Sequence, residues 1–91
     1  MKFELGQTVM TRGINALLEE EVITHSDLMD IMTQHVNGDW GDICEEDKES
    51  NDYALKNDER LMSTYTVKGQ KLWIITEWDR SVTTILLPSE Y

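Results

Sequence analysis

Hydrophobic and polar residues alternate in the C-terminal third of the chain, with the period of two that is typical of β-strands. Three such stretches, rich in β-branched and aromatic residues, read RLMSTYTV (60–67), KLWIITE (71–77) and SVTTILL (81–87). Two short turns separate them, Lys68-Gly69-Gln70 and Trp78-Asp79-Arg80. The pattern therefore predicts a C-terminal antiparallel β-meander of at least three strands.

Upstream of this meander, apolar residues spaced three and four apart predict two helices. The first follows Thr11, a good N-cap residue, and runs to Glu20. The second begins at Thr24, whose spacing to Asp27 fits a capping box, and ends at Asn37-Gly38, where glycine tolerates a left-handed conformation. Weak alternation in residues 3–10 indicates a short edge strand.

A third helix is compatible with the composition of residues 45–56, with Asp42 as its cap. Apolar residues lie only at the ends of this segment, so the helix must be stabilised mainly by packing there. We therefore predict a single α+β domain, residues 1–91, with two or three N-terminal helices packed on the C-terminal antiparallel meander.

Both faces of the last two strands carry apolar residues, so we expect helices to cover one face and a loop or a partner to cover the other. Trp73, which alternates within its strand, is expected in the core. An uncovered apolar face would instead imply self-association, so a structural homodimer without a ligand is one alternative.

The chain is strongly acidic, with a formal net charge of −10 over 91 residues. Such charge opposes direct binding to nucleic acid or to an anionic membrane and suits a partner with a basic surface. A single cysteine excludes an internal disulfide, and neither a signal-peptide pattern nor a membrane-spanning apolar run is present. We expect a cytoplasmic protein.

Residues 39–59 concentrate the charge, with nine acidic side chains against two lysines, a net −7. A charge run is usually a solvated helix face. Alternatively, because a helix rises about 1.5 Å per residue and duplex DNA carries one charge per about 1.7 Å, this run imitates the phosphates of a duplex. The candidate partner-binding residues are Asp39, Trp40, Asp42, Glu45, Glu46, Asp47, Glu49 and Asp52.

Other chemistry finds little support in the spacing of the residues. His25, His35 and Cys44 lie ten and nine residues apart, without the paired spacing of a metal site, so we expect neither a metal nor a cofactor. His35 is expected as a satisfied histidine at the core edge, and Cys44 as a small buried apolar residue. Trp40 between two glycines has two interpretations, an anchor for its loop or an interface hot spot, and Trp78 divides in the same way.

Several segments together resemble a family of small bacterial proteins borne on plasmids, prophages and other mobile elements. They are the opening KFELGQ, the loop GDWGD, the segment DYALK and the ending WIITEWDRSVTTILLPSEY. This family is mostly uncharacterised and carries the loose labels plasmid-related or restriction-associated. The resemblance implies a mobile-element setting, where small acidic proteins often inhibit host defence, and it supplies no catalytic residues.

A shorter stretch, residues 57–85, is similar to the C-terminal sheet of barnase-like ribonucleases. The resemblance implies a catalytic set of Arg60, Asp79, Arg80 and Thr83. Arg80 stands where the family has its general-acid histidine, and an arginine cannot trade protons near neutral pH. A hydrogen-bonded turn pair is the simpler interpretation of Asp79-Arg80.

The sequence thus favours a non-enzymatic protein that inhibits a nucleic-acid-binding host defence complex, of the anti-CRISPR or anti-restriction type, through a phosphate-mimicking acidic surface. A barnase-like ribonuclease or toxin relic and the homodimer are the alternatives.

Overall fold

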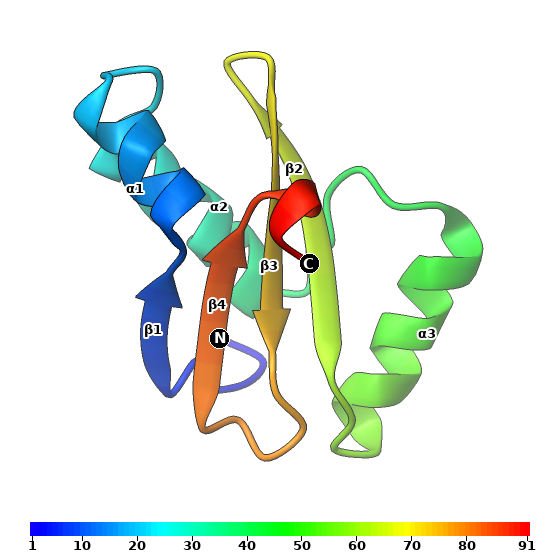
Figure 1. Cartoon of the computed structure of the whole chain (residues 1–91). Coiled ribbons are helices and arrows are strands. Elements are labelled where there is room, and N and C mark those ends of the chain that lie inside the picture. The colour runs from blue at the N-terminus through cyan, green and yellow to red at the C-terminus, as the bar shows by residue number, and fades with distance from the viewer.

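The computed structural model describes residues 1–91 and has the predicted α+β architecture (Figure 1). In chain order its elements are β1 (Gln7–Met10), α1 (Arg12–Glu19), α2 (His25–Val36), α3 (Glu45–Lys56), β2 (Leu61–Val67), β3 (Gln70–Thr76), β4 (Val82–Leu86) and the 3-10 turn η1 (Pro88–Glu90). None of the helices combines the length and apolar character needed to cross a lipid bilayer.

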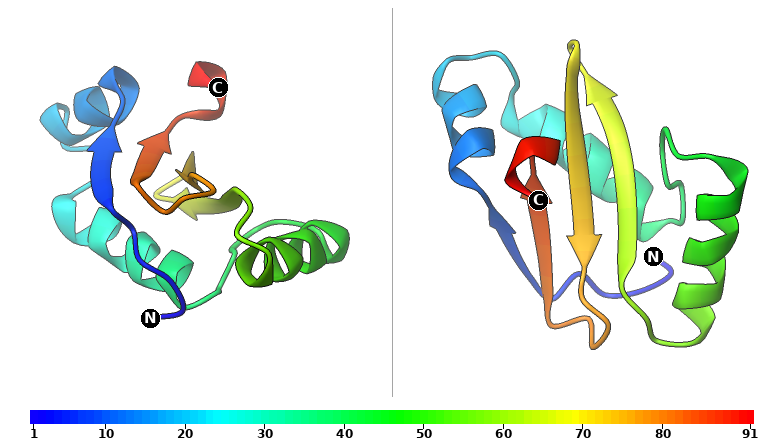
Figure 2. Two further views of the ribbon diagram at one scale, coloured as in Figure 1. Left: turned by 90° about the horizontal axis from the view of Figure 1, so that it is seen from below. Right: turned by 45° about the vertical axis from the view of Figure 1, so that its right-hand side comes forward.

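The four strands form one mixed sheet in the order β1-β4-β3-β2. β2 pairs with β3 and β3 with β4, both antiparallel, which confirms the meander. The N-terminal strand β1 joins as an edge strand and runs parallel to β4, a pairing that its sequence did not specify. Figures 1 and 2 show α3 beside the β2 edge of the sheet, away from β1 and α1.

One face of the sheet builds the main core against α1 and α2. Pairing of Leu61 with Thr76, and of Thr76 with Thr83, puts these residues on that face together. The core cluster consists of Ile14, Ile23, Leu28, Ile31, Tyr65, Leu72, Ile74 and Ile85. Because each fully buried aliphatic side chain stabilises by about 1.5–3 kcal/mol, this cluster is the main source of stability.

The opposite face of the sheet is partly covered by the C-terminal turn. The ring of Tyr91 meets Trp73 edge-on at 5.3 Å, and Ile75 and Leu86 on the same face are buried. Trp73 itself lies on this face and is half-buried, so its expected place in the core is wrong. The aromatic ring of Tyr91, which follows the last strand in sequence, supplies the cover instead.

Local sequence signals explain the start of α2 and the tight turn after β2. Thr24 and Asp27 form the predicted capping box at the start of α2. Lys68 and Gly69 both have positive φ, 50° and 80°, as a two-residue type I′ hairpin requires. The Lys68 ammonium group also lies 3.0 Å from the Asp27 carboxylate, which ties this hairpin to the start of α2.

Thr11 is the N-cap residue of α1, but its side chain makes no capping hydrogen bond to the helix. Its hydroxyl donates instead to Glu90, whose carboxylate also accepts from the backbone N–H of Gly13 at 3.0 Å. These hydrogen bonds, that from Thr11 first, lower the pKa of Glu90. A carboxylate from the far end of the chain therefore caps α1, and the same contact fastens the C-terminal turn.

A line of hydrogen bonds runs through the core from His35. The imidazole is fully buried, with Nδ1 2.5 Å from the Ser63 hydroxyl and Nε2 2.9 Å from the Thr76 hydroxyl. Thr83 bonds Thr76 at 2.8 Å and donates to the carbonyl of Leu5 at 2.7 Å. Because a hydroxyl has a single proton, Thr76 must donate to Thr83 and accept from Nε2–H, so Nδ1 accepts from Ser63. His35 is thus a fully satisfied neutral histidine within the core, rather than at its edge.

We expect the stability of the protein to fall between pH 7 and pH 5 because of His35. Burial, with a smaller contribution from the charge of Arg80, lowers the pKa of His35 to about 4 from 6.5. The unfolded chain therefore binds a proton in this range and the folded chain does not, so acid favours unfolding by about 2 kcal/mol at pH 5 relative to pH 7. Urea unfolding at the two pH values measures this difference.

The exposed His25 provides the control, since His25→Gln should leave the pH dependence unchanged whereas His35→Gln should remove it. Lowered carboxyl pKa values such as that of Asp27 affect stability chiefly at lower pH. If His35→Gln does not fold, NMR titration of the His35 ring answers the same question. A ring that protonates near pH 6.5 in the folded protein would contradict the expectation.

Candidate partner-binding surface

Helix α3 is held beside the sheet by the side chain of Asn51, which completes the hydrogen bonding of the outer edge of β2. The Asn51 amide donates to the carbonyl of Met62 at 2.6 Å and accepts from its N–H at 3.2 Å. Asn51 is 7% exposed and lies mid-helix on the side of α3 that faces the sheet. The helix is therefore attached through its polar middle, and not only through its ends as its sequence suggested.

The loop before α3 closes the next part of the same edge. Asp42 N–H donates to the carbonyl of Thr64 at 2.7 Å, and Thr64 N–H donates to the carbonyl of Trp40 at 3.2 Å. Gly41, between them, has φ +78°, and a Cβ there would lie 2.0 Å from the Thr64 carbonyl oxygen. Only glycine allows the loop to approach β2 this closely.

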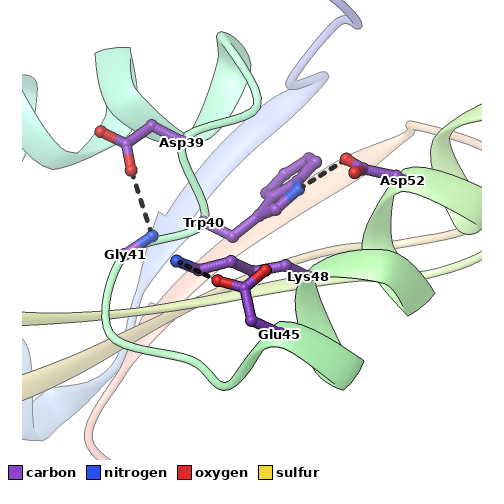
Figure 3. Close-up of polar contacts among 6 residues, drawn as sticks. All are labelled: Asp39, Trp40, Gly41, Glu45, Lys48 and Asp52. Carbon is purple, nitrogen blue, oxygen red and sulfur yellow. Dashed lines mark hydrogen bonds and ion pairs between the residues drawn. The ribbon is translucent and has the colours of Figure 1, made fainter.

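Trp40 anchors this loop to α3 and β2. Its side chain is 3% exposed, packs with Ala54 and Leu61, and stacks on Phe3 at 6.2 Å between ring centroids. The indole N–H donates to the Asp52 carboxylate at 3.0 Å, as Figure 3 shows. The anchor interpretation of Trp40 is therefore the correct one, and its buried side chain presents no hot spot to a partner.

The seven acidic candidates are all exposed, but they divide into two groups. Three of them help to hold the loop: Asp39 accepts from Gly41 N–H, Asp42 accepts from the Thr66 hydroxyl, and Asp52 accepts from Trp40. The remaining four are Glu45, Glu46, Asp47 and Glu49. Among these, one cationic contact occurs, from Lys48 to Glu45 at 3.8 Å (Figure 3).

We call the five carboxylates Glu45, Glu46, Asp47, Glu49 and Asp52 the acidic ridge of α3. Positions i, i+4 and i+7 share one side of a helix, which aligns Glu45, Glu49 and Asp52 along the axis. Five charges over these eight residues, about 10 Å of helix, give one charge per about 2 Å. The ridge thus approaches the linear charge density of duplex DNA.

The start of α3 differs from the expectation in two respects. Cys44, not Asp42, is the N-cap residue, and no side chain caps the helix there. Cys44 is also exposed, so its expected burial as a small apolar residue is wrong. The acidic first turn and Lys56 in the last turn instead complement the helix dipole.

The four residues of the ribonuclease resemblance do not meet in one site. Arg60 bonds the Tyr91 hydroxyl, whereas Thr83 is buried on the other side of the sheet, where it bonds Thr76 and Leu5. Asp79 accepts from both the N–H and the hydroxyl of Ser81, which lowers its pKa. These contacts leave no common position for a phosphate.

Arg80 has a structural task. Its guanidinium donates to the carbonyls of Glu59, Glu77, Trp78 and Ala54, at 2.6 to 3.3 Å. It also lies 5.7 Å from the centroid of the Phe3 ring. Arg80 therefore joins the β3–β4 turn to the C-terminal end of α3 and to the N-terminal segment, which confirms the interpretation of Asp79-Arg80 as a hydrogen-bonded turn.

Sequence reasoning missed Asn51 and the exposed aromatic Tyr53. The sequence did contain a signal for Asn51. Asparagine is a poor helix former, so its place in the middle of the predicted helix indicates a role for its side chain. Tyr53, on the ridge side of α3, is 59% exposed, and Trp78 in the β3–β4 turn is 64% exposed. Unlike Trp40, Trp78 is therefore available to a partner.

No group of three His, Cys, Asp or Glu side chains in the structure is placed to hold a metal ion together. No protein-family model matches the chain, and neither does any curated protein or solved structure.

Replacing Asn51 by alanine should destabilise the protein by about 1–3 kcal/mol, because the Met62 N–H and carbonyl lose their partner in a partly buried place. Unfolding in urea gives the change in free energy. Ser50→Ala, one residue away on the exposed side, should stay within about 0.5 kcal/mol of the parent. Equal stability of the two variants would show that Asn51 does not hold α3 to the sheet.

Proposed function

We propose that this protein is a non-enzymatic inhibitor that docks its acidic ridge in the basic groove of a nucleic-acid-binding host defence complex. The observation that carries the proposal is the exposure of five carboxylates on one helix, of which Glu45 has a lysine contact, Asp52 has a hydrogen bond from Trp40, and the other three have neither. Charges left without partners of their own are free to pair with the Lys and Arg side chains of another protein. Such pairing steers association and is weakened by salt.

The position of the ridge also supports the proposal. α3 stands at one edge of the sheet, so its outer side is not shielded by other elements (Figure 1). Asn51 and Trp40 hold this helix at its middle, and Arg80 holds it near its C-terminal end. A rigid row of charges suits a groove shaped for nucleic acid, because less conformational entropy is lost on binding.

The setting comes from the resemblance to proteins of plasmids and prophages. Mobile elements are targets of restriction and CRISPR complexes, and these complexes hold nucleic acid in positively charged channels. A net charge of −10 opposes binding of the protein to nucleic acid itself. The proposal therefore has the protein compete with nucleic acid for the defence complex.

The experiment is a pull-down from bacterial lysate, with a low-salt wash followed by a high-salt wash. We expect the captured protein to be a nucleic-acid-binding defence component that elutes as salt rises and is displaced by duplex DNA. The variant Glu45→Gln, Glu46→Gln, Glu49→Gln keeps the side-chain shapes and should weaken capture by at least about tenfold, because it removes three charge-assisted contacts.

The matched control is Glu19→Gln, Glu20→Gln, Asp30→Asn, which removes as many charges from exposed positions of α1 and α2 and their ends. It should bind like the parent protein. If both triple variants lost affinity equally, net charge rather than the ridge would be responsible. Undiminished capture by the ridge variant would refute the proposal.

A further inference from the structure

The two edges of the sheet differ in a way that bears on assembly. The outer edge of β2 is occupied by Asn51 and by the loop through Gly41. The other edge is β1, and all four of its residues are exposed. Unpaired edge strands invite pairing with another strand.

The direction of the free groups on β1 follows from the pairing with β4. The N–H groups of Gln7 and Thr11 donate to carbonyls of Ser81 and Ile85 beside them. Since backbone groups alternate sides along a strand, the N–H and C=O groups of Thr8 and Met10 point away from the sheet.

Beside this free edge lies an apolar groove between β1 and α2. It has a volume of about 130 Å³, and its lining includes Thr8, Met10, Leu28, Met29 and Met32. Met10 is 43% exposed and Met29 61%. An exposed group of flexible methionines next to a free strand offers apolar area in addition to backbone hydrogen bonds.

Charge is distributed so that two copies meet at their less acidic ends. β1 itself has no charged residue, and residues 1–36, which form β1, α1 and α2, carry two basic against six acidic residues, a net −4. Residues 39–59, beyond the opposite edge, carry the net −7. Pairing of β1 with β1 therefore keeps the two acidic ridges far apart.

We infer that the occupant of this edge is a second copy of the chain, paired antiparallel through β1 about a two-fold axis. In the register that places Val9 opposite Val9 of the second copy, Thr8 and Met10 of opposite copies exchange their outward N–H and C=O groups. Because the β2 edge is closed, no third copy can add to the sheet, and the assembly ends at a dimer. This inference does not rest on the proposed function.

The test is sedimentation equilibrium of the full chain from low to high micromolar concentration, at low and high salt. We expect a monomer–dimer equilibrium that strengthens with salt, because screening reduces repulsion between two chains of charge −10. Binding through the acidic ridge should weaken with salt, so the two proposals can fail separately. Hydrogen exchange should slow at Thr8 and Met10 as concentration rises.

Two variants locate the interface. Thr8→Pro removes an outward N–H without touching the β4 ladder, and Met10→Lys puts a charge in the groove; each should weaken dimerisation by about tenfold or more. Ser50→Lys adds the same charge on α3 and should leave the dimer intact. Circular dichroism checks that each variant is folded.

A monomer at all concentrations would overturn the inference. So would a monomer in which the amides of Thr8 and Met10 are protected from hydrogen exchange only after another protein is added. So would a dimer that both β1 variants leave unchanged, or one that Ser50→Lys weakens as much as Met10→Lys does.

Discussion

The closing of the outer β2 edge is the interaction on which the rest of this molecule depends. Asn51 satisfies the N–H and carbonyl of Met62, and the loop through Gly41 satisfies those of Thr64. These few hydrogen bonds hold a helix of low intrinsic stability, since α3 has two buried residues, Asn51 and Ala54, and no side-chain N-cap. They also leave β1 as the open edge of the sheet. The acidic surface and the free strand are therefore two consequences of one arrangement.

The second level of support is polar as well, and it connects segments far apart in the chain. The line from His35 through Thr76 and Thr83 reaches the carbonyl of Leu5, so the N-terminal segment is fixed by hydrogen bonds inside the core. Arg80 connects the β3–β4 turn with the C-terminal end of α3 from outside the core, with four backbone carbonyls as acceptors. A buried network of this kind is stabilising only when every member is satisfied, and no buried side-chain nitrogen or oxygen lacks a partner here. Arg80, which stands where the ribonucleases have their general-acid histidine, thus supports the fold.

Most of the fold could be predicted from local patterns in the sequence. The wrong predictions concern features that depend on contacts between distant segments. The alternation in residues 60–87 is a local signal, as is the Thr24–Asp27 capping box, and both appear as predicted. The parallel pairing of β1 with β4 depends on residues more than seventy positions apart. The prediction that Cys44 is buried was wrong for the same reason, because its exposure depends on where the Trp40 anchor places the loop. The apolar character of tryptophan did not by itself distinguish the buried anchor Trp40 from the exposed Trp78. The indole N–H of Trp40 donates to Asp52, and the neighbouring glycines let its loop approach β2, whereas Trp78 lies in an exposed turn.

The acidic residues divide into those that accept hydrogen bonds within the protein and those whose carboxylates make no such contact. Asp39, Asp42 and Asp52 accept hydrogen bonds from the loop or the sheet, and their charge is a by-product of that role. Glu46, Asp47 and Glu49 have no such contact. Like charges so close on one helix repel one another, by a few tenths of a kcal/mol for each neighbouring pair, which the fold must offset through Asn51 and Trp40. A solvated face needs only polarity, which serine or glutamine would supply without this repulsion. Of the ridge carboxylates only Glu45 has a cation beside it, so most of this repulsion is not relieved by the protein's own lysines and arginines.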